Sequence, residues 1–303
     1  MKILLIAGGW SHEREISLSG ARGIEKTLLS RGHSVTFFDV LTDFDQLLRA
    51  ATEHEFAMIN LHGAPGEDGL IQAMLDTADC PYQGTGPAAS LLALHKAAAK
   101  QIFRYAGLPT PDWEFLPRPP EACWNPRLSY PLFVKSNTGG SSLLMGRARN
   151  RAELDARLAE IFSAGDEVLL EQELRGVEVT CGVLGENALP PLLIEPTAGD
   201  FFDYASKYAA GGARETCPAP LPEAVTAEVR RLTLAAHRVL GLTGYSRADF
   251  ILTDNETPAL LEVNTLPGMT ATSLVPQEAA ALGLDFGRML EKLIKLGMRR
   301  NKD

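Results

Sequence analysis

The chain carries Ser246-Arg247-Ala248-Asp249-Phe250-Ile251-Leu252 and, after a short turn, Ala259-Leu260-Leu261-Glu262-Val263-Asn264. Both segments are mostly apolar and short, which predicts two neighbouring strands. Side chains alternate faces along a strand, so Arg247 shares a face with Asp249, and Glu262 shares a face with Asn264. If the strands pair, two carboxylates and an amide oxygen converge beside an arginine.

This convergence supports two interpretations. Carboxylate and amide oxygens without His or Cys suit Mg²⁺ carried by nucleotide phosphates. The same residues could instead form a salt-bridge ladder of Arg247, Asp249 and Glu262 on a solvated face. The apolar residues around them favour the metal, because a buried carboxylate pair without a function is costly.

The N-terminal part predicts an α/β unit. An apolar strand over Ile3–Ala7 ends at two glycines, and an amphipathic helix over 17–30 follows. Further strands are expected over 34–40 and 56–61, with a helix over 70–77. This alternation implies a parallel sheet with helices on both faces.

The rest of the chain predicts two mixed α+β units. A helical stretch over 87–106, with a possible break near His95, leads into a proline-rich connection. Strands are expected over 131–135, 143–148, 167–172, 178–184 and 191–195. Helices are expected over 151–162 and 222–240, and a polar loop is expected over 199–216.

Two glycine-bearing segments are weaker signals. Lys135 precedes a Gly/Ser loop that ends at Ser142, and such loops let backbone N–H groups close on phosphate oxygens. An ordinary hairpin loop explains this sequence about as well. Gly8-Gly9 enters a helix through Glu13, but the dinucleotide fingerprint is missing, and an acid there suits a cationic ammonium better than a pyrophosphate.

Composition narrows the classes of partner. The chain has 303 residues and a net charge of −9, without the basic stripe typical of nucleic-acid binders. No apolar run approaches the length of a membrane span. The cysteines are scattered, which predicts reduced thiols in a cytoplasmic protein.

Several spaced motifs occur in one order along the chain. They are Gly8-Gly9 with Glu13-Arg14-Glu15-Ile16-Ser17, Leu61-His62-Gly63 with Gly66-Glu67-Asp68-Gly69, Tyr82-Gln83-Gly84-Thr85-Gly86, Gly140-Ser141-Ser142, Lys207-Tyr208, Arg247-Ala248-Asp249, Glu262-Val263-Asn264-Thr265-Leu266-Pro267-Gly268-Met269-Thr270 and Ser273-Leu274-Val275-Pro276. Together they resemble the D-alanine–D-alanine ligase family of the ATP-grasp superfamily, nearly end to end.

The resemblance implies a three-domain ATP-grasp fold of the α/β class, built partly from α+β units. Residues 1–85 would form an N-terminal, parallel-sheet substrate-binding domain. Residues 86–176 would form the central ATP-grasp subdomain, and residues 177–303 the C-terminal catalytic domain. The nucleotide would bind between the central and C-terminal domains.

The resemblance also assigns residues to roles. The implied catalytic residues are Glu13, Ser141, Tyr208, Arg247 and Gly268. The implied substrate-binding residues are His62, Glu67, Ser273 and Leu274. The implied ATP-binding residues are Lys96, Lys135, Ser142, Glu171, Gln172, Leu174, Glu178 and Lys207. The implied ligands of two Mg²⁺ ions, or of Mn²⁺, are Asp249, Glu262 and Asn264.

The implied activity joins two D-alanines into D-alanyl-D-alanine through an acyl phosphate, for peptidoglycan and cell-wall synthesis. The family also implies a cytoplasmic homodimer that uses small-molecule substrates. Departures from the family pattern at Ser136, Leu144, His95 and Gln172 keep two alternatives open. These are a ligase for other amino or hydroxy acids and a weakly catalytic ATP-binding relative.

Overall fold

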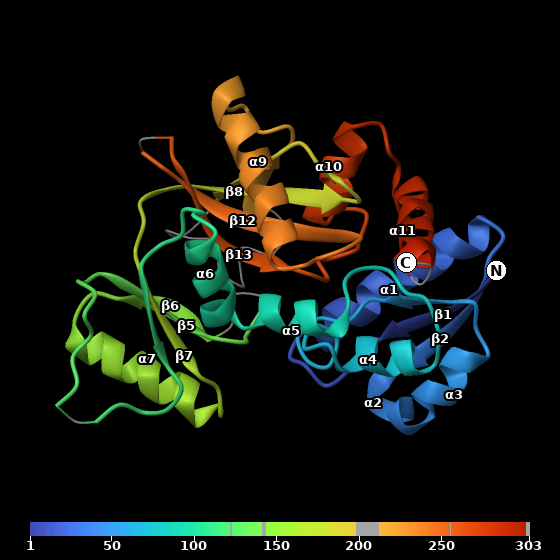
Figure 1. Cartoon of the computed structure of the whole chain (residues 1–303), viewed down its shortest axis with the longest axis horizontal. Coiled ribbons are helices and arrows are strands. Elements are labelled where there is room, and N and C mark those ends of the chain that lie inside the picture. The colour runs from blue at the N-terminus through green and yellow to red at the C-terminus, as the bar shows by residue number, and fades with distance from the viewer. Residues whose placement is uncertain (122, 141–143, 198–211, 255, 301–303) are drawn as a thin grey trace.

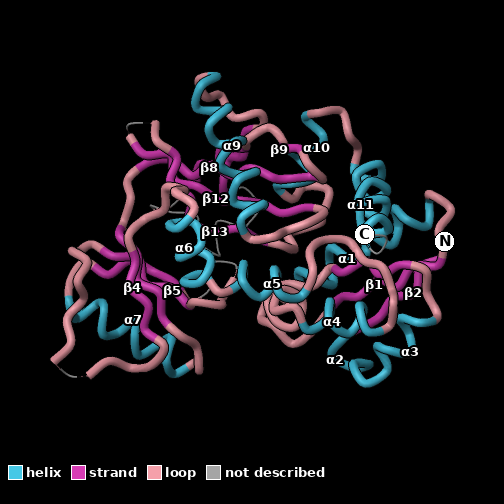
Figure 2. Tube along the Cα trace, viewed as in Figure 1, coloured by secondary structure: helices cyan, strands magenta, loops and turns pink. Residues whose placement is uncertain are grey.

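The chain folds around three separate sheets (Figures 1 and 2). The structure is a computed structural model, and it describes residues 1–121, 123–140, 144–197, 212–254 and 256–300. The sheets follow one another in chain order, so each forms from a continuous part of the sequence.

The first sheet is parallel, with strand order β2-β1-β3. Its elements are β1 (Lys2–Ala7), α1 (Arg14–Ser30), β2 (Ser34–Asp39), α2 (Val40–Asp43), the 3₁₀ turn η1 (Phe44–Gln46), α3 (Leu47–Thr52), β3 (Phe56–Ile59) and α4 (Leu70–Thr77). Figure 1 shows α1 on one side of this sheet and α2, α3 and α4 on the other. The predicted parallel α/β unit is therefore confirmed.

The second sheet is antiparallel, with strand order β4-β7-β5-β6, and α7 packs on it. Its elements, with the helices that lead into it, are α5 (Pro87–Leu94), α6 (Lys96–Tyr105), β4 (Trp113–Leu116), β5 (Leu132–Ser136), β6 (Met145–Ala148), α7 (Arg151–Ser163) and β7 (Val168–Gln172). The loop that joins β5 to β6 contains the Gly/Ser segment singled out above.

The third sheet is also antiparallel, with the order β11-β10-β8-β12-β13 and β9 beside β8. The elements of this last part are β8 (Gly176–Leu184), β9 (Asn187–Ala188), β10 (Leu192–Pro196), β11 (Ala213–Thr216), α9 (Glu223–Val239), β12 (Tyr245–Thr253), β13 (Pro258–Asn264), α10 (Leu274–Ala281) and α11 (Phe286–Arg300). Helix α9 covers one face of this sheet.

The C-terminal helix α11 packs against the N-terminal part of the chain. Leu290 and Leu293 of α11 are fully buried and belong to the same apolar cluster as Ile3 and Leu5 of β1. Figure 1 shows α11 beside α1. Burial of these side chains, each of which contributes about 1.5–3 kcal/mol, therefore ties the third part of the chain to the first.

Several local predictions need correction. The predicted strand over 34–40 ends at Asp39, because the Asp39 side chain accepts a hydrogen bond from Leu41 N–H and begins α2 at Val40. The end of the predicted loop over 199–216 is the edge strand β11, paired with β10. Strand β4 and helix α3 were not predicted, since each is short and lacks a clear apolar period.

The predicted break at His95 is confirmed. The His95 Nδ1 atom accepts a hydrogen bond from Ala98 N–H at 3.1 Å and caps α6. The ring also lies against Phe115, and its Nε2 atom is 3.4 Å from a Glu167 carboxylate oxygen. His95 therefore fixes the start of the helix that carries Lys96.

Leu144 has a left-handed backbone with φ of 50°, immediately before β6. A side chain costs about 1–2 kcal/mol in this region, whereas glycine adopts it freely. Leu144→Gly is therefore expected to be more stable than Leu144→Ala by about 1 kcal/mol, although alanine is usually the more stabilising residue. Urea unfolding of the two variants measures the difference, and a more stable Ala variant would contradict the strain.

Candidate active site

Two cavities of about 510 and 320 Å³ adjoin in the middle of the molecule. Lys96, Gly139, Gly140 and Glu262 line both of them. The first cavity lies between the first and third sheets, and the second lies between the second and third sheets. All predicted site residues that fall within the described ranges line one cavity or both.

The two strands quoted at the outset pair as expected. Arg247 is the register partner of Asn264, and Asp249 is the partner of Glu262, next to a bulge at Asp249 and Phe250. The Arg247 guanidinium donates to both oxygens of the Asp249 carboxylate, over 2.8 and 2.6 Å. Thr180 Oγ1 of β8 donates to the same carboxylate over 2.7 Å. The Arg247–Asp249 ion pair of the salt-bridge interpretation is therefore present. The oxygen atoms of Asp249, Glu262 and Asn264 still converge on the cavities.

The oxygen donors of this strand pair fit a hard divalent cation. Asp249 and Glu262 face the second cavity, while Glu262 and Asn264 face the first. Glu262 also lies 3.8 Å from Lys96 Nζ, and about a third of its side chain is exposed. Among the described residues, no group of three or more His, Cys, Asp or Glu side chains is placed to hold a metal. An ion here would therefore need further oxygens, as a bound triphosphate supplies.

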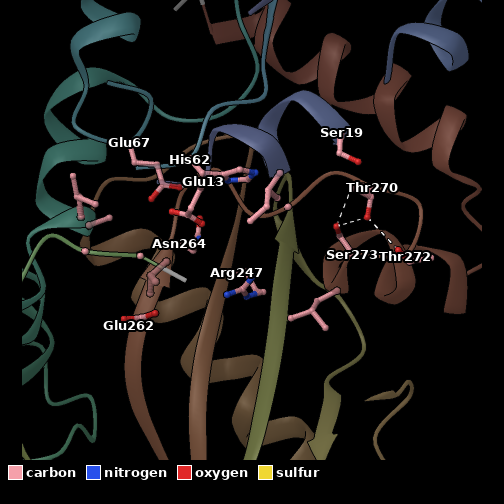
Figure 3. Close-up of a pocket in the computed structure, with 18 of the residues that line it drawn as sticks. Glu13, Ser19, His62, Glu67, Arg247, Glu262, Asn264, Thr270, Thr272 and Ser273 are labelled. Atoms are coloured by element: carbon pink, nitrogen blue, oxygen red, sulfur yellow. Dashed lines mark hydrogen bonds and ion pairs between the residues drawn. The ribbon is translucent and has the colours of Figure 1, made fainter. Parts of the chain in front are cut away.

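One end of the first cavity is acidic and buried. Glu13 occupies the N-cap position of α1 and is 8% exposed. His62 lies beside it, and His62 Nδ1 is 4.0 Å from Glu67 Oε1. Figure 3 shows these three side chains grouped at one end, Ser273 with Thr270 and Thr272 at the other, and Arg247 between them.

Burial controls the charge at this end. It raises the pKa of Glu67 to about 8, and the nearby Glu13 carboxylate adds to the rise. Burial also lowers the pKa of His62, although Glu13 opposes that effect. At neutral pH Glu67 and His62 are therefore mainly uncharged, which leaves Glu13 as the acidic group that can hold a cationic ammonium.

The opposite end is built by the start of α10. Ser273 is the N-cap residue, and its Oγ accepts the N–H of Thr270 at 3.0 Å. Leu274 is the first residue of α10, so its N–H belongs to the unsatisfied donors of the helix N-terminus. An added Cβ at Gly268 would lie 3.0 Å from Ser273 Oγ, so glycine lets the two segments meet closely. This end is suited to a carboxylate.

The second cavity contains a buried cluster of charges. Glu171 forms ion pairs with Lys135 and with Lys100, and the Lys100 contact is 2.7 Å. Burial favours the neutral acid, but the two lysines outweigh it and lower the pKa of Glu171. Two lysines thus pair with one carboxylate beside a cavity that Gln172, Leu174 and Glu178 also line.

Lys100 was missed by the sequence reasoning. It is fully buried in α6, where it also donates to Thr110 Oγ1 over 2.6 Å. The signal was its helical spacing, because Lys100 follows Lys96 by one turn and therefore lies on the same face. Lys96 Nζ donates to Gly139 O over 2.5 Å and lines both cavities, whereas Lys100 meets the second cavity through its ion pair with Glu171.

Four predicted site residues lie outside the described residues. They are Ser141, Ser142, Lys207 and Tyr208. Within the described chain, every helix falls short of the length and apolarity needed to cross a membrane.

Comparison with known proteins identifies the family. A family model described as "D-ala D-ala ligase C-terminus" matches residues 102–295. A D-alanine–D-alanine ligase from Desulfovibrio desulfuricans is 68% identical over 98% of this chain and 97% of that relative. One from Lawsonia intracellularis is 55% identical over the full length of both.

Solved structures agree with this result. The D-alanine–D-alanine ligase from Bacillus anthracis complexed with ATP superposes with a TM-score of 0.89 at 31% identity, over 100% of this chain and 99% of that one. A D-Ala:D-Ser ligase from Enterococcus faecalis superposes with a TM-score of 0.83 at 28% identity, over 98% of this chain and 99% of that one. The three-sheet architecture and the full-length similarity together show that this chain belongs to the D-alanine–D-alanine ligase family.

Proposed function

We propose that this chain is an ATP-dependent ligase that joins two D-alanines into D-alanyl-D-alanine. The observation that carries the proposal is the junction of the two cavities at Lys96, Gly139, Gly140 and Glu262. A phosphate-binding site and a carboxylate-binding site must touch if a carboxylate is to attack a phosphoryl group. Relatives 55–68% identical over nearly full length carry this name, and a solved relative was complexed with ATP.

The first D-alanine is assigned to the acidic end of the first cavity. Glu13 holds its ammonium, and His62 and Glu67 line the same subsite. Its carboxylate then faces the junction and attacks the γ-phosphorus of ATP, and ADP leaves. The product of this step is an acyl phosphate.

ATP is assigned to the second cavity, with the adenine beside Glu171, Gln172 and Leu174. Glu178 binds the ribose, and Lys96 and Lys135 neutralise the phosphates. Two Mg²⁺ ions, or Mn²⁺, are assigned to Asp249, Glu262 and Asn264, whose hard oxygen donors fit such ions. When bound, these ions neutralise the charge of the transferring phosphoryl group.

The second D-alanine is assigned to the start of α10. Ser273 and the Leu274 N–H bind its carboxylate, which aims its amine at the acyl carbon. The amine attacks, a tetrahedral intermediate forms, and inorganic phosphate leaves as the amide bond is completed. Arg247 and the Gly268 N–H stabilise the oxyanion of that intermediate.

Four further residues, the domain division, the oligomeric state and the cellular role complete the proposed function. Following the resemblance, Ser142 and Lys207 are proposed to bind ATP. Tyr208 is proposed to latch to Glu13 and Ser141, which would exclude the water that hydrolyses an acyl phosphate. We also propose the three domains 1–85, 86–176 and 177–303, a homodimer, and a cytoplasmic role in making peptidoglycan precursor. The proposed partners are small-molecule substrates, and neither nucleic acid nor a membrane is proposed as a partner.

Product analysis tests the function directly. The protein is incubated with ATP, Mg²⁺ and D-alanine, and the products are identified by mass spectrometry while ADP release is followed. We expect D-alanyl-D-alanine with one ADP per dipeptide. D-Serine, D-lactate and L-amino acids are tested in parallel, because the chain also resembles a D-Ala:D-Ser ligase. Faster ADP release with one of these, and none with D-alanine alone, would contradict the assignment.

A further inference from the structure

A carboxylate outside both cavities organises the glycine loop that separates them. Asp166 lies in the turn between α7 and β7 and is half-buried. Its Oδ2 accepts a short hydrogen bond from the Ser136 hydroxyl. Its Oδ1 accepts from Thr138 Oγ1 over 3.0 Å and from Glu167 N–H over 2.7 Å. Three donors thus converge on one side chain.

Ser136 connects the Asp166 carboxylate to the glycine loop. It is the last residue of β5 and is 2% exposed. While its hydroxyl donates to Asp166, the same oxygen accepts Gly139 N–H over 2.6 Å. The backbone of Gly139 is therefore held through one hydroxyl by the Asp166 carboxylate.

A second set of contacts ties the same loop to α6. Asn137 is fully buried, and its Oδ1 accepts Ala97 N–H over 3.0 Å while its backbone O accepts Lys96 N–H over 3.1 Å. Its Nδ2 donates to Glu167 over 2.9 Å. The loop is thus fixed between the start of β7 and the N-terminus of α6, and these contacts leave little freedom for residues 137–139.

The fixed loop contacts both halves of the proposed active site. Gly139 and Gly140 line both cavities, and Lys96 Nζ donates to Gly139 O. A Cβ added at Gly140 would lie 2.8 Å from Glu13 Oε2. A small displacement of this loop would therefore move it against the groups assigned to phosphate and to ammonium.

We propose that Asp166 is a positioning residue for ATP binding, acting through Ser136 and Thr138 on the loop 137–140. It does not line either cavity. It holds the loop in a conformation that the triphosphate would otherwise have to impose at the expense of binding energy. This inference rests on the proposed function, which places ATP in the second cavity.

The change in nucleotide affinity expected for Asp166→Asn is opposite to the one that simple electrostatics predicts. Removal of a carboxylate near a triphosphate site reduces repulsion and should tighten the binding of an anion. Asp166→Asn instead replaces an acceptor of three hydrogen bonds by an amide that also donates, which releases the loop. We therefore expect Asp166→Asn to weaken nucleotide binding about 10-fold, as loss of one charge-assisted hydrogen bond would.

Titration calorimetry of the full chain with Mg²⁺ and the nonhydrolysable analogue AMP-PNP measures this effect. Ser136→Ala removes one hydroxyl without changing charge and should weaken binding in the same direction, about 3-fold. Asp155→Asn is the matched control, since Asp155 is exposed on α7 and pairs with Arg151 one turn away. Binding to this control should equal that of the wild type.

Steady-state kinetics separate positioning from a general loss of structure. The KM for ATP should rise with its dissociation constant, while kcat at saturating ATP stays within about 2-fold of the wild type, because bound nucleotide restores the loop. Unchanged or tighter AMP-PNP binding in Asp166→Asn would overturn the proposal. A fall in kcat and melting temperature with unchanged nucleotide affinity would also overturn it.

The proposed function can fail independently of this inference. If the wild type binds AMP-PNP but releases no ADP with D-alanine, the ligase assignment fails. The affinity difference between the wild type and Asp166→Asn still decides the positioning role. If the wild type is active and the difference is missing, only the positioning role fails.

Discussion

Glu262→Gln is expected to lower D-alanine-dependent ADP release by about 10³-fold, because loss of cation-mediated charge stabilisation at a phosphoryl group costs several kcal/mol. Glu262 lines both cavities and lies 3.8 Å from Lys96 Nζ. Gln keeps the shape of the side chain but removes the negative charge. The loss should therefore fall on turnover, and the fold should survive.

Glu262 is a cleaner choice than Asp249 for this test. Asp249 holds the Arg247 guanidinium in a buried ion pair, so its substitution would also leave that cation without its partner. Glu262 has about a third of its side chain exposed, and its change disturbs less of the surrounding structure.

A coupled assay of ADP release, run across a range of Mg²⁺ concentrations, measures the effect. Glu223→Gln, an exposed carboxyl in the first turn of α9, is the matched control and should keep full activity. Near wild-type turnover of Glu262→Gln at limiting Mg²⁺ would remove Glu262 from the proposed metal site.

Glu278→Gln is expected to stabilise the protein at pH 8.5 by about 4–5 kcal/mol, since the pKa of Glu278 lies well above the usual 4.5 and one pKa unit corresponds to about 1.4 kcal/mol. Glu278 is fully buried in α10, where its Oε2 accepts Gly182 N–H over 2.7 Å. Within the described residues, its Oε1 has no hydrogen-bond partner. Burial raises the pKa of Glu278 to about 8, Arg247 opposes the rise, and Asp249 adds to it.

The direction of the pH dependence follows from these values. Below about pH 4.5 the carboxyl is protonated in both the folded and the unfolded chain, so it adds no pH dependence. Between about pH 4.5 and 8 the unfolded chain loses this proton while the folded chain keeps it. The free energy of unfolding of the wild type therefore falls over this range relative to that of the Gln variant, and the difference levels off above about pH 8.

Urea unfolding at pH 4.5, 6.5 and 8.5 gives this difference, and the comparison with Gln cancels the titration of other groups. The exposed Glu223→Gln serves again as the control, with a change of less than about 0.5 kcal/mol at each pH. Parallel stability profiles for the wild type and Glu278→Gln would show that Glu278 is ionised in the folded protein.

The sequence predicted the elements that have strong apolar patterns. The parallel first sheet, the break at His95 and the pairing of β12 with β13 were all expected, and the structure confirms them. The edge strand β11 and helix α3 were not, because their residues are partly exposed and carry no clear period. Tertiary contacts, rather than local preference, stabilise such short elements.

The residues of the candidate site also fall into those that the sequence predicted and those that only the structure revealed. Residues in recognisable motifs, such as Glu13, Arg247 and Ser273, were named from the sequence, and the structure places them around one cavity. Lys100, Asp166 and Glu278 were not named. The spacing of Lys100 from Lys96 on one helix was a local signal for the first of these. Asp166 and Glu278 instead depend on a partner distant in sequence or on complete burial, which no local pattern reveals.

By itself, the sequence determined the alternation that puts Arg247 with Asp249 and Glu262 with Asn264, since strand geometry fixes the face of each side chain. It also determined the family, through unusual segments in a fixed order. Only the tertiary structure decided that Asp249 pairs with Arg247, that Glu171 shares two lysines, and that Asp166 holds the glycine loop. These contacts depend on which segments meet in space and on how far water is excluded, and both are properties of the packed chain.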